Sequence, residues 1–208
     1  MKISNKLSKK ITIITGHYGA GKTNFAVNLA LYFKESGKKV AIADLDIVNP
    51  YFRTADFKKL FNDTGIELAA SDFANSSLDI PSVKLDVTGL ADKTDHLIID
   101  VGGDPEGARA LGRFVPTLKK SGYDMVYVIN RYRNLTQSAG QAVEIMKNIE
   151  SSCKLKCTAL FNNSHLGKET TDEVISQSNP FADEVSRLTG LPLLELPVEV
   201  YVKPIWDM

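Results

Sequence analysis

Residues 16–23, GHYGAGKT, have the types and the spacing of a loop that binds phosphate. Glycines let the backbone curl until successive N–H groups point at phosphate oxygens. In the matched pattern G-x-x-x-x-G-K-[ST], Lys22 is expected to reach the β- and γ-phosphates and Thr23 to coordinate Mg²⁺. The predicted nucleotide contacts are Gly16, His17, Tyr18, Gly19, Ala20, Gly21, Lys22, Thr23 and Asn24.

Two other segments contain the carboxylates that phosphoryl chemistry needs. ADLDIVNP carries Asp44 and Asp46, and LIIDVGGD carries Asp100 and Asp104. Ligands of doubly wound folds collect at the carboxyl ends of strands, where both segments are expected to lie. An Asp that ends an apolar strand is the Walker B pattern, so Asp100 is predicted to hold the Mg²⁺ shell, with a helix cap or turn as the alternative. Asp46 lies nearer its strand end than Asp44 and is predicted to orient the attacking water, aided by Asp104.

Apolar runs alternate with longer helical patterns along the chain. The runs are nearly continuous, which is typical of strands covered by helices on both faces. Repeated strand–helix–strand units give a mostly parallel, doubly wound sheet. We therefore predict an α/β fold in one domain over residues 1–208, with 71–94 as its least regular part. The predicted strands are 11–15, 39–46, 66–71, 96–103, 123–130, 155–162 and 191–197, and the predicted helices are 22–36, 136–150 and 169–189.

The composition is ordinary for a soluble globular protein, with 43% hydrophobic and 24% charged residues. Lys and Arg number 25 against 25 Asp and Glu, so there is no strong signal for nucleic acid. No apolar run approaches the roughly 20 residues that span a bilayer. The apolar part of the N-terminus is too short for a signal peptide, which predicts a cytoplasmic protein. Cys153 and Cys157 are predicted to be ordinary reduced cysteines, because no other Cys and no nearby His completes a metal site.

In their order along the chain, GHYGAGKT, DLDIVNPYFR, IIDVGGD and ALFNN resemble the ParA/MinD/CobQ-type (SIMIBI class) nucleotide-binding family, which includes the nitrogenase iron protein. The resemblance covers residues 10–165 and implies a P-loop NTPase fold. It places switch I at the acidic end of the second strand. Switch II falls on Asp100 and Gly103, and Asp104 fits the second Asp of the iron protein. Asn162 matches the family residue that reads adenine.

The sequence departs from this family at several points. His17 stands where ParA and MinD carry a lysine that reaches the nucleotide of the partner subunit. It either donates to phosphate or packs as a loop residue, which leaves the nucleotide-driven dimer open. The cluster cysteines of the iron protein are missing, so no iron–sulfur cluster is predicted. Pro197 and Pro204 interrupt the tail, so the membrane helix of MinD is not expected. No Asn-Lys-x-Asp follows a strand, which favours ATP over GTP.

The leading hypothesis is an Mg²⁺-dependent ATP-binding protein with slow ATP hydrolysis. It would act as a nucleotide switch on a partner protein or within a homodimer, for example in maturation. The alternative is an ATP-dependent kinase or ligase that resembles dethiobiotin synthetase, with Arg53, Arg131 and Arg133 as candidate positive groups for its substrate. Arg131 or Arg133 could also neutralise phosphate, although a solvated charge is the favoured interpretation. A third possibility is a module that binds nucleotide without turnover. His165 lies near the expected adenine position, where a plain loop role is favoured over packing on the base.

Overall fold

The computed structural model describes residues 7–45, 57–70, 86–103 and 105–195. Within these ranges one sheet of six strands has the order β3-β2-β4-β1-β5-β6. Every pair of neighbouring strands is parallel, as the nearly continuous apolar runs predict. The strands are β1 Ile11–Gly16, β2 Val40–Leu45, β3 Glu67–Ala70, β4 His96–Val101, β5 Asp124–Ile129 and β6 Ala159–Asn162.

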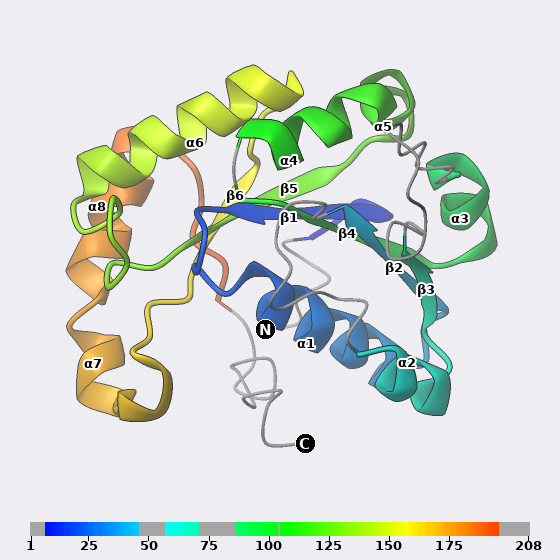
Figure 1. Ribbon diagram of the computed structural model, residues 1–208, viewed down its shortest axis with the longest axis horizontal. Coiled ribbons are helices and arrows are strands. Elements are labelled where there is room, and N and C mark those ends of the chain that lie inside the picture. Colours follow the sequence, from blue (N-terminus) through cyan, green and yellow to red (C-terminus); the bar gives the residue numbers. More distant parts are fainter. Residues whose placement is uncertain (1–6, 46–56, 71–85, 104, 196–208) are drawn as a thin grey trace, which may run out of the picture.

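Helices cover both faces of the sheet (Figure 1). In that view α1 and α2 lie below the sheet, α4, α5 and α6 lie above it, and α8 lies at its left-hand side. In the described part of the chain, no helix has both the length and the apolar character that a bilayer-spanning helix needs. The helices are α1 Lys22–Glu35, α2 Lys58–Thr64, α3 Val87–Lys93, α4 Pro105–Leu111, α5 Val115–Ser121, α6 Ala139–Cys153, α7 Asp172–Ser176 and α8 Asn179–Thr189, with short 3-10 helices at Gly112–Phe114 and Gly167–Glu169.

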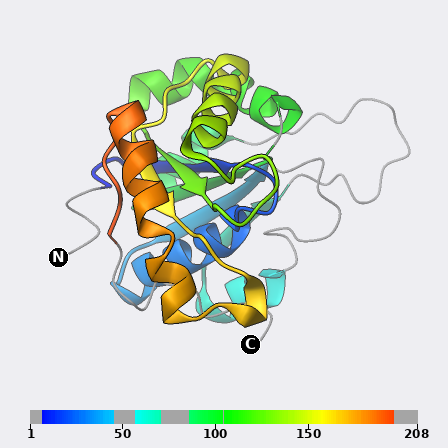
Figure 2. The ribbon, with the colours of Figure 1, turned by 90° about the vertical axis from the view of Figure 1, so that its left-hand side faces the viewer.

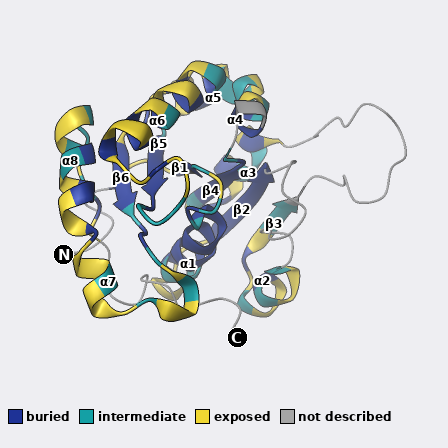
Figure 3. Ribbon diagram, turned by 60° about the vertical axis from the view of Figure 1, so that its left-hand side comes forward, coloured by how far each residue is buried: buried dark blue, intermediate teal, exposed yellow. Residues whose placement is uncertain are grey.

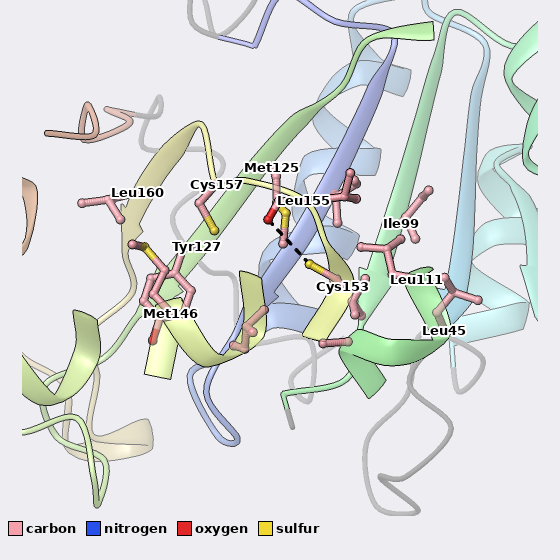
Figure 4. Packing of buried hydrophobic residues seen from close by; sticks show 14 of the residues in the cluster. Leu45, Ile99, Leu111, Met125, Tyr127, Met146, Cys153, Leu155, Cys157 and Leu160 are labelled. Atoms are coloured by element: carbon pink, nitrogen blue, oxygen red, sulfur yellow. Dashed lines mark hydrogen bonds between the residues drawn. The ribbon is translucent and has the colours of Figure 1, made fainter. Parts of the chain in front are cut away.

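The core has one cluster on each face of the sheet. On the α1 side, Phe25 stacks on Phe161 of β6 with ring centroids 4.3 Å apart. On the other side, side chains of the strands pack against α4 and α6 (Figure 4). Cys153 and Cys157 belong to this second cluster, and both are free and buried. Burial raises the pKa of both thiols, so neither is a reactive thiolate at neutral pH.

Several predicted boundaries differ from the structure: β6 begins at 159 and not at 155, β4 ends at 101 and not at 103, and α6 runs to 153 and not to 150. Three further differences have a local reason. Helix α6 begins at Ala139 and not at 136, because Ser138 and Gln141 form a capping box. The helix predicted over 169–189 is two helices, α7 and α8, with Pro180 in the first turn of α8. The strand predicted over 191–197 is reduced, within the described residues up to 195, to a single parallel bridge between Leu193 and Leu160.

The loops that follow the strands meet at one edge of the sheet. In Figure 1 the loop between β1 and α1 lies at the left end of β1, and Figure 2 looks onto that edge. Figure 3 shows the strands behind it as buried and the outer surfaces of α6 and α8 as exposed. The buried sheet therefore holds the phosphate loop and the loops after β4, β5 and β6 in fixed relative positions.

His96, at the start of β4, is expected to make stability depend on pH. Its ring stacks on that of Phe33, with the ring centroids 3.8 Å apart. Its Nδ1 atom is buried with no hydrogen-bond partner in the described part of the chain. Burial and then the charge of Lys38 lower the pKa of His96 below its ordinary value of 6.5, against the opposing effect of Asp95. The unfolded chain therefore takes up the proton first. The contribution of His96 to stability is complete above pH 6.5 and is lost as the pH falls below it.

His96→Phe keeps the stacked ring and removes the titration. The free energy of unfolding of this variant, measured by denaturant melts from pH 7.5 to 5, should fall less steeply than that of the wild type. Some slope should remain, because the pKa values of His17 and His165 are lowered too. Identical slopes for the two proteins would contradict the prediction.

Candidate nucleotide-binding site

The phosphate loop runs from the end of β1 to the first turn of α1. Gly19 and Gly21 have φ angles of 73° and 85°, a left-handed conformation that glycine adopts without strain. The N–H of Ala20 closes a turn on the carbonyl of His17 at 3.1 Å. Gly21 caps α1 without a side-chain hydrogen bond, so the positive end of the helix is open toward the loop. This arrangement suits an anion at the helix terminus.

The first glycine of the motif is required by the sheet. A Cβ atom on Gly16 would lie 2.4 Å from the carbonyl oxygen of Val128 in β5. Strands β1 and β5 pair in parallel at this level, with Gly16 opposite Val128. Only a residue without a side chain lets the loop leave the sheet so close to its neighbour.

Lys22 is buried and lies between the loop and the end of β4. Its Nζ atom donates to the carbonyl oxygen of His17 at 3.4 Å. A Cβ atom on Gly103 would lie 2.8 Å from that Nζ and 2.7 Å from the backbone nitrogen of Tyr18. The glycine of the D-x-x-G segment is therefore packed against the loop.

Thr23 and Asp100 meet next to this lysine. The hydroxyl of Thr23 donates to Oδ2 of Asp100 at 2.7 Å, and both side chains are buried. Asp44 of β2 is the register partner of Asp100 in β4, and it is buried as well. Oxygen donors of this kind are the ligands that Mg²⁺ prefers. The other two predicted carboxylates, Asp46 and Asp104, lie outside the described residues.

The loop after β5, residues 130–136, packs against the outer side of the phosphate loop. Nε of Arg133 donates to the carbonyl oxygen of Gly19 at 2.8 Å. The loop is closed by the hydroxyl of Thr136, which donates to the carbonyl of Asn130 at 2.7 Å. The backbone N–H of Tyr132 donates to Oδ1 of Asn130 at 3.0 Å. Sequence reasoning gave these residues no structural part in the phosphate loop.

His17 is held by the same loop. It forms a hydrogen bond with the backbone of Asn134, which favours the protonated ring. Burial and the charge of Lys22 outweigh this bond and lower the pKa of His17 below its ordinary value. The ring is therefore largely neutral at pH 7 and is turned onto its own chain. In this position it does not resemble a cation that reaches toward a second subunit.

The loop after β6 also contacts the phosphate loop, through Asn163. Its Nδ2 atom donates to the carbonyl oxygen of Ala20 at 2.8 Å. A Cβ atom on Gly21 would lie 2.1 Å from that Nδ2 and 3.4 Å from Nε2 of His165. The pKa of His165 is lowered by burial and then by the charge of Arg133, so the two side chains are close in space. The sequence predicts a role for the adjacent Asn162 and none for Asn163.

The predicted adenine residue, Asn162, bonds away from the phosphate loop. Its Nδ2 atom donates to the hydroxyl of Ser178 at 2.8 Å, and its Oδ1 atom accepts from the hydroxyl of Ser164 at 2.7 Å. The other arginine of the β5 loop, Arg131, donates to the carbonyl of Gln177 at 2.5 Å. Arg53, the third arginine of the kinase hypothesis, lies outside the described residues.

Comparisons with known proteins agree on the family and the fold. The model of the CobQ/CobB/MinD/ParA nucleotide binding domain matches residues 11–160. No curated protein sequence matches the chain.

Solved structures with a similar fold include receptors of the signal recognition particle. FtsY from Mycoplasma mycoides has a TM-score of 0.63 and 18% identity, over 93% of this chain and 64% of that chain. FtsY from Thermotoga maritima has a TM-score of 0.59 and 20% identity, over 93% and 67%. FtsY from Elizabethkingia anophelis, in complex with GDP, has a TM-score of 0.59 and 18% identity, over 89% and 56%. The chain thus spans less than two-thirds of the Mycoplasma FtsY chain, and the likeness is one of fold.

Proposed function

We propose a function from the fact that the chain belongs to the CobQ/CobB/MinD/ParA nucleotide-binding family. The proposed function is to bind ATP with Mg²⁺, to hydrolyse it slowly and to act as a switch on a partner protein. The chain is a nucleotide-binding P-loop domain.

The observation that carries the proposal is the contact between Thr23 and Asp100. A buried hydroxyl and a buried carboxylate lie 2.7 Å apart at the carboxyl edge of a parallel sheet, beside the phosphate loop. A hydroxyl and a carboxylate side by side are oxygen donors of the kind that Mg²⁺ prefers. Thr23 and Asp100 would hold Mg²⁺, whose charge would neutralise part of the charge on the phosphates.

The other residues of the site have separate proposed roles. Lys22 and the loop N–H groups would bind the β- and γ-phosphates and fix their position. Asp46, aided by Asp104, would orient a water for attack. The water oxygen bonds to the γ-phosphorus while the bond from that phosphorus to the bridging oxygen breaks. ADP and inorganic phosphate leave, and the proton from water remains with the products.

ATP is the proposed nucleotide, although the Elizabethkingia FtsY structure contains GDP. Residues 130–133 read Asn-Arg-Tyr-Arg, without the Asp that pairs with guanine in Asn-Lys-x-Asp. Asn162 would contact the adenine. Its amide nitrogen carries two N–H groups, and within the described residues its one hydrogen bond is to Ser178. Competition between unlabelled ATP and GTP for a fluorescent ATP analogue tests this choice, and a preference for GTP would contradict it.

Phosphate release from ATP by the purified chain with Mg²⁺ distinguishes the candidate functions. Steady release from ATP alone would support the switch. Release only after addition of a metabolite would favour a kinase or ligase, and binding without release would leave a module that does not turn over. Light scattering with ADP or a non-hydrolysable ATP analogue then tests for a switch within a homodimer, where only the analogue should raise the molar mass.

The metal role of Asp100 predicts the behaviour of Asp100→Asn. Asparagine keeps an oxygen that accepts from Thr23 and removes the charge. Phosphate release should fall about 100-fold, because the charge of a bound metal contributes several kcal/mol in the transition state. When the rate is measured against Mg²⁺ concentration, half-saturation should require more Mg²⁺ than in the wild type, because a metal ligand has lost its charge.

Asp95→Asn is the matched control for this variant. Asp95 is exposed and directly precedes β4, whereas Asp100 lies near the opposite end of the same strand. Asp95→Asn should keep the wild-type rate and Mg²⁺ dependence. Equal Mg²⁺ titrations for Asp100→Asn and the wild type would refute the metal role.

A further inference from the structure

Arg133 is an unexplained cation at the edge of the phosphate loop. Its Nε atom is bonded to the carbonyl oxygen of Gly19 at 2.8 Å, and its Cζ atom lies 3.7 Å from the place of a Cβ on Gly19. The guanidinium group is thus held against Gly19, in the middle of the loop. In the described part of the chain, its two terminal amino groups make no hydrogen bond. They remain available for a ligand.

The segment that carries Arg133 is fixed from both ends. Asn130 accepts from Thr136 and from the backbone N–H groups of Tyr132 and Arg133. Leu135 has a φ of 68°, a strained conformation for a residue with a side chain. Strain of this kind persists where the surrounding contacts determine the backbone. The loop therefore presents Arg133 in one position and loses little entropy when it meets a ligand.

Arg133 supplies positive charge on the outer side of the phosphate loop. The residue after the first glycine is His17, whose ring is largely neutral and bonded to Asn134 of its own chain. Lys22 approaches from the inside of the loop, beside Gly103. An arginine is protonated at any physiological pH and forms two parallel hydrogen bonds with phosphate oxygens. Among the described residues, Arg133 is the arginine whose side chain contacts the phosphate loop from outside.

We propose that Arg133 binds the phosphate chain of the bound nucleotide from within the same chain. The inference rests on the proposed function and deepens it. Arginines that stabilise phosphoryl transfer come from the same chain in some P-loop proteins and from a partner in others. Here the outer cation does not depend on a second subunit. The rate of ATP hydrolysis per chain is therefore independent of protein concentration.

Three variants test the role of Arg133. Arg133→Gln keeps an N–H donor for the carbonyl of Gly19 and removes the charge, while Arg133→Lys keeps a charge. Arg131→Ala is the matched control, because Arg131 is on the same loop but bonds to Gln177. Calorimetry measures binding of adenosine and of a non-hydrolysable ATP analogue, and phosphate release is measured over a wide range of protein concentrations.

Arg133→Gln should weaken binding of the ATP analogue about 10- to 100-fold, the effect of one hydrogen bond between charged groups. Its affinity for adenosine should be unchanged. Arg133→Lys should recover part of the loss, Arg131→Ala should match the wild type, and the wild-type rate per chain should be constant with concentration.

Other outcomes separate this inference from the proposed function. Equal losses for adenosine and the ATP analogue would overturn it, since they would assign Arg133 to the nucleoside. So would an Arg133→Gln variant that matches Arg131→Ala, or a rate per chain that rises with protein concentration. A wild-type chain that binds no ATP would instead remove the proposed function itself.

Discussion

Lys22→Ala is expected to lower phosphate release from ATP by about 1000-fold or more, because on the proposed function Lys22 is the charged donor to the developing charge on the phosphates. The Lys22 ammonium is buried, contacts the carbonyl of His17 and lies beside Gly103. No other described lysine lies in the loop. The loss should appear in phosphate release and in the affinity for ATP, with a smaller change for adenosine.

Lys34→Ala is the control for this variant. Lys34 lies in the last turn of α1, where its Nζ atom donates to the carbonyl of Gly65, away from the phosphate loop. This variant should keep the wild-type rate. Lys22→Met, which retains most of the apolar stem, guards against a folding defect and should be as inactive as Lys22→Ala. A folded Lys22→Met protein that still hydrolyses ATP would show that the loop does not act as proposed.

Gly21→Ala is expected to eliminate nucleotide binding and also to destabilise the fold. Gly21 has a φ of 85°, where a side chain costs about 1–2 kcal/mol. The added Cβ would also lie 2.1 Å from Nδ2 of Asn163 and break its bond to Ala20, at a cost of about 1 kcal/mol. The sum corresponds to a fall in Tm of about 5–10 °C for a chain of this size. Thermal unfolding and calorimetry with an ATP analogue measure the two effects.

Gly37→Ala separates backbone strain from damage to the site. Gly37 follows α1 with a φ of 78°, and a Cβ there would have nothing within 4 Å. This variant should be destabilised only by the strained backbone, about 1–2 kcal/mol. It should bind nucleotide as the wild type does. If Gly21→Ala and Gly37→Ala bind ATP equally well, then the contact between Asn163 and Ala20 has no importance for the site.

Much of the architecture could be predicted because the strands of a parallel sheet are buried on both faces. All six strands lie where apolar runs occur in the sequence, such as Ile11–Gly16 and Asp124–Ile129. The boundaries of helices were less accurate, although the signals were present. Ser138 with Gln141 is a capping box in the sequence, and Pro180 marks the first turn of a new helix.

The phosphate loop could be predicted because its motif is contiguous, whereas the residues that support it are not. Gly16 through Asn24 carry their pattern within a few positions. Asn163 and Arg133 contact the loop from distant parts of the chain, through backbone carbonyls that any residue provides. No local sequence pattern predicts such contacts. They follow from the strand order, which brings β5 and β6 to the same side of β1.

The bond between Asn163 and Ala20 also has a consequence for the order of folding. It joins residues 143 positions apart, so the phosphate loop acquires its last support only when β6 has entered the sheet. Pairings of such long sequence separation form slowly, because the intervening chain must first be ordered. During synthesis the loop leaves the ribosome 143 residues before its partner. A nascent chain therefore gains its full affinity for nucleotide late, and the ligand then selectively stabilises chains whose sheet is complete.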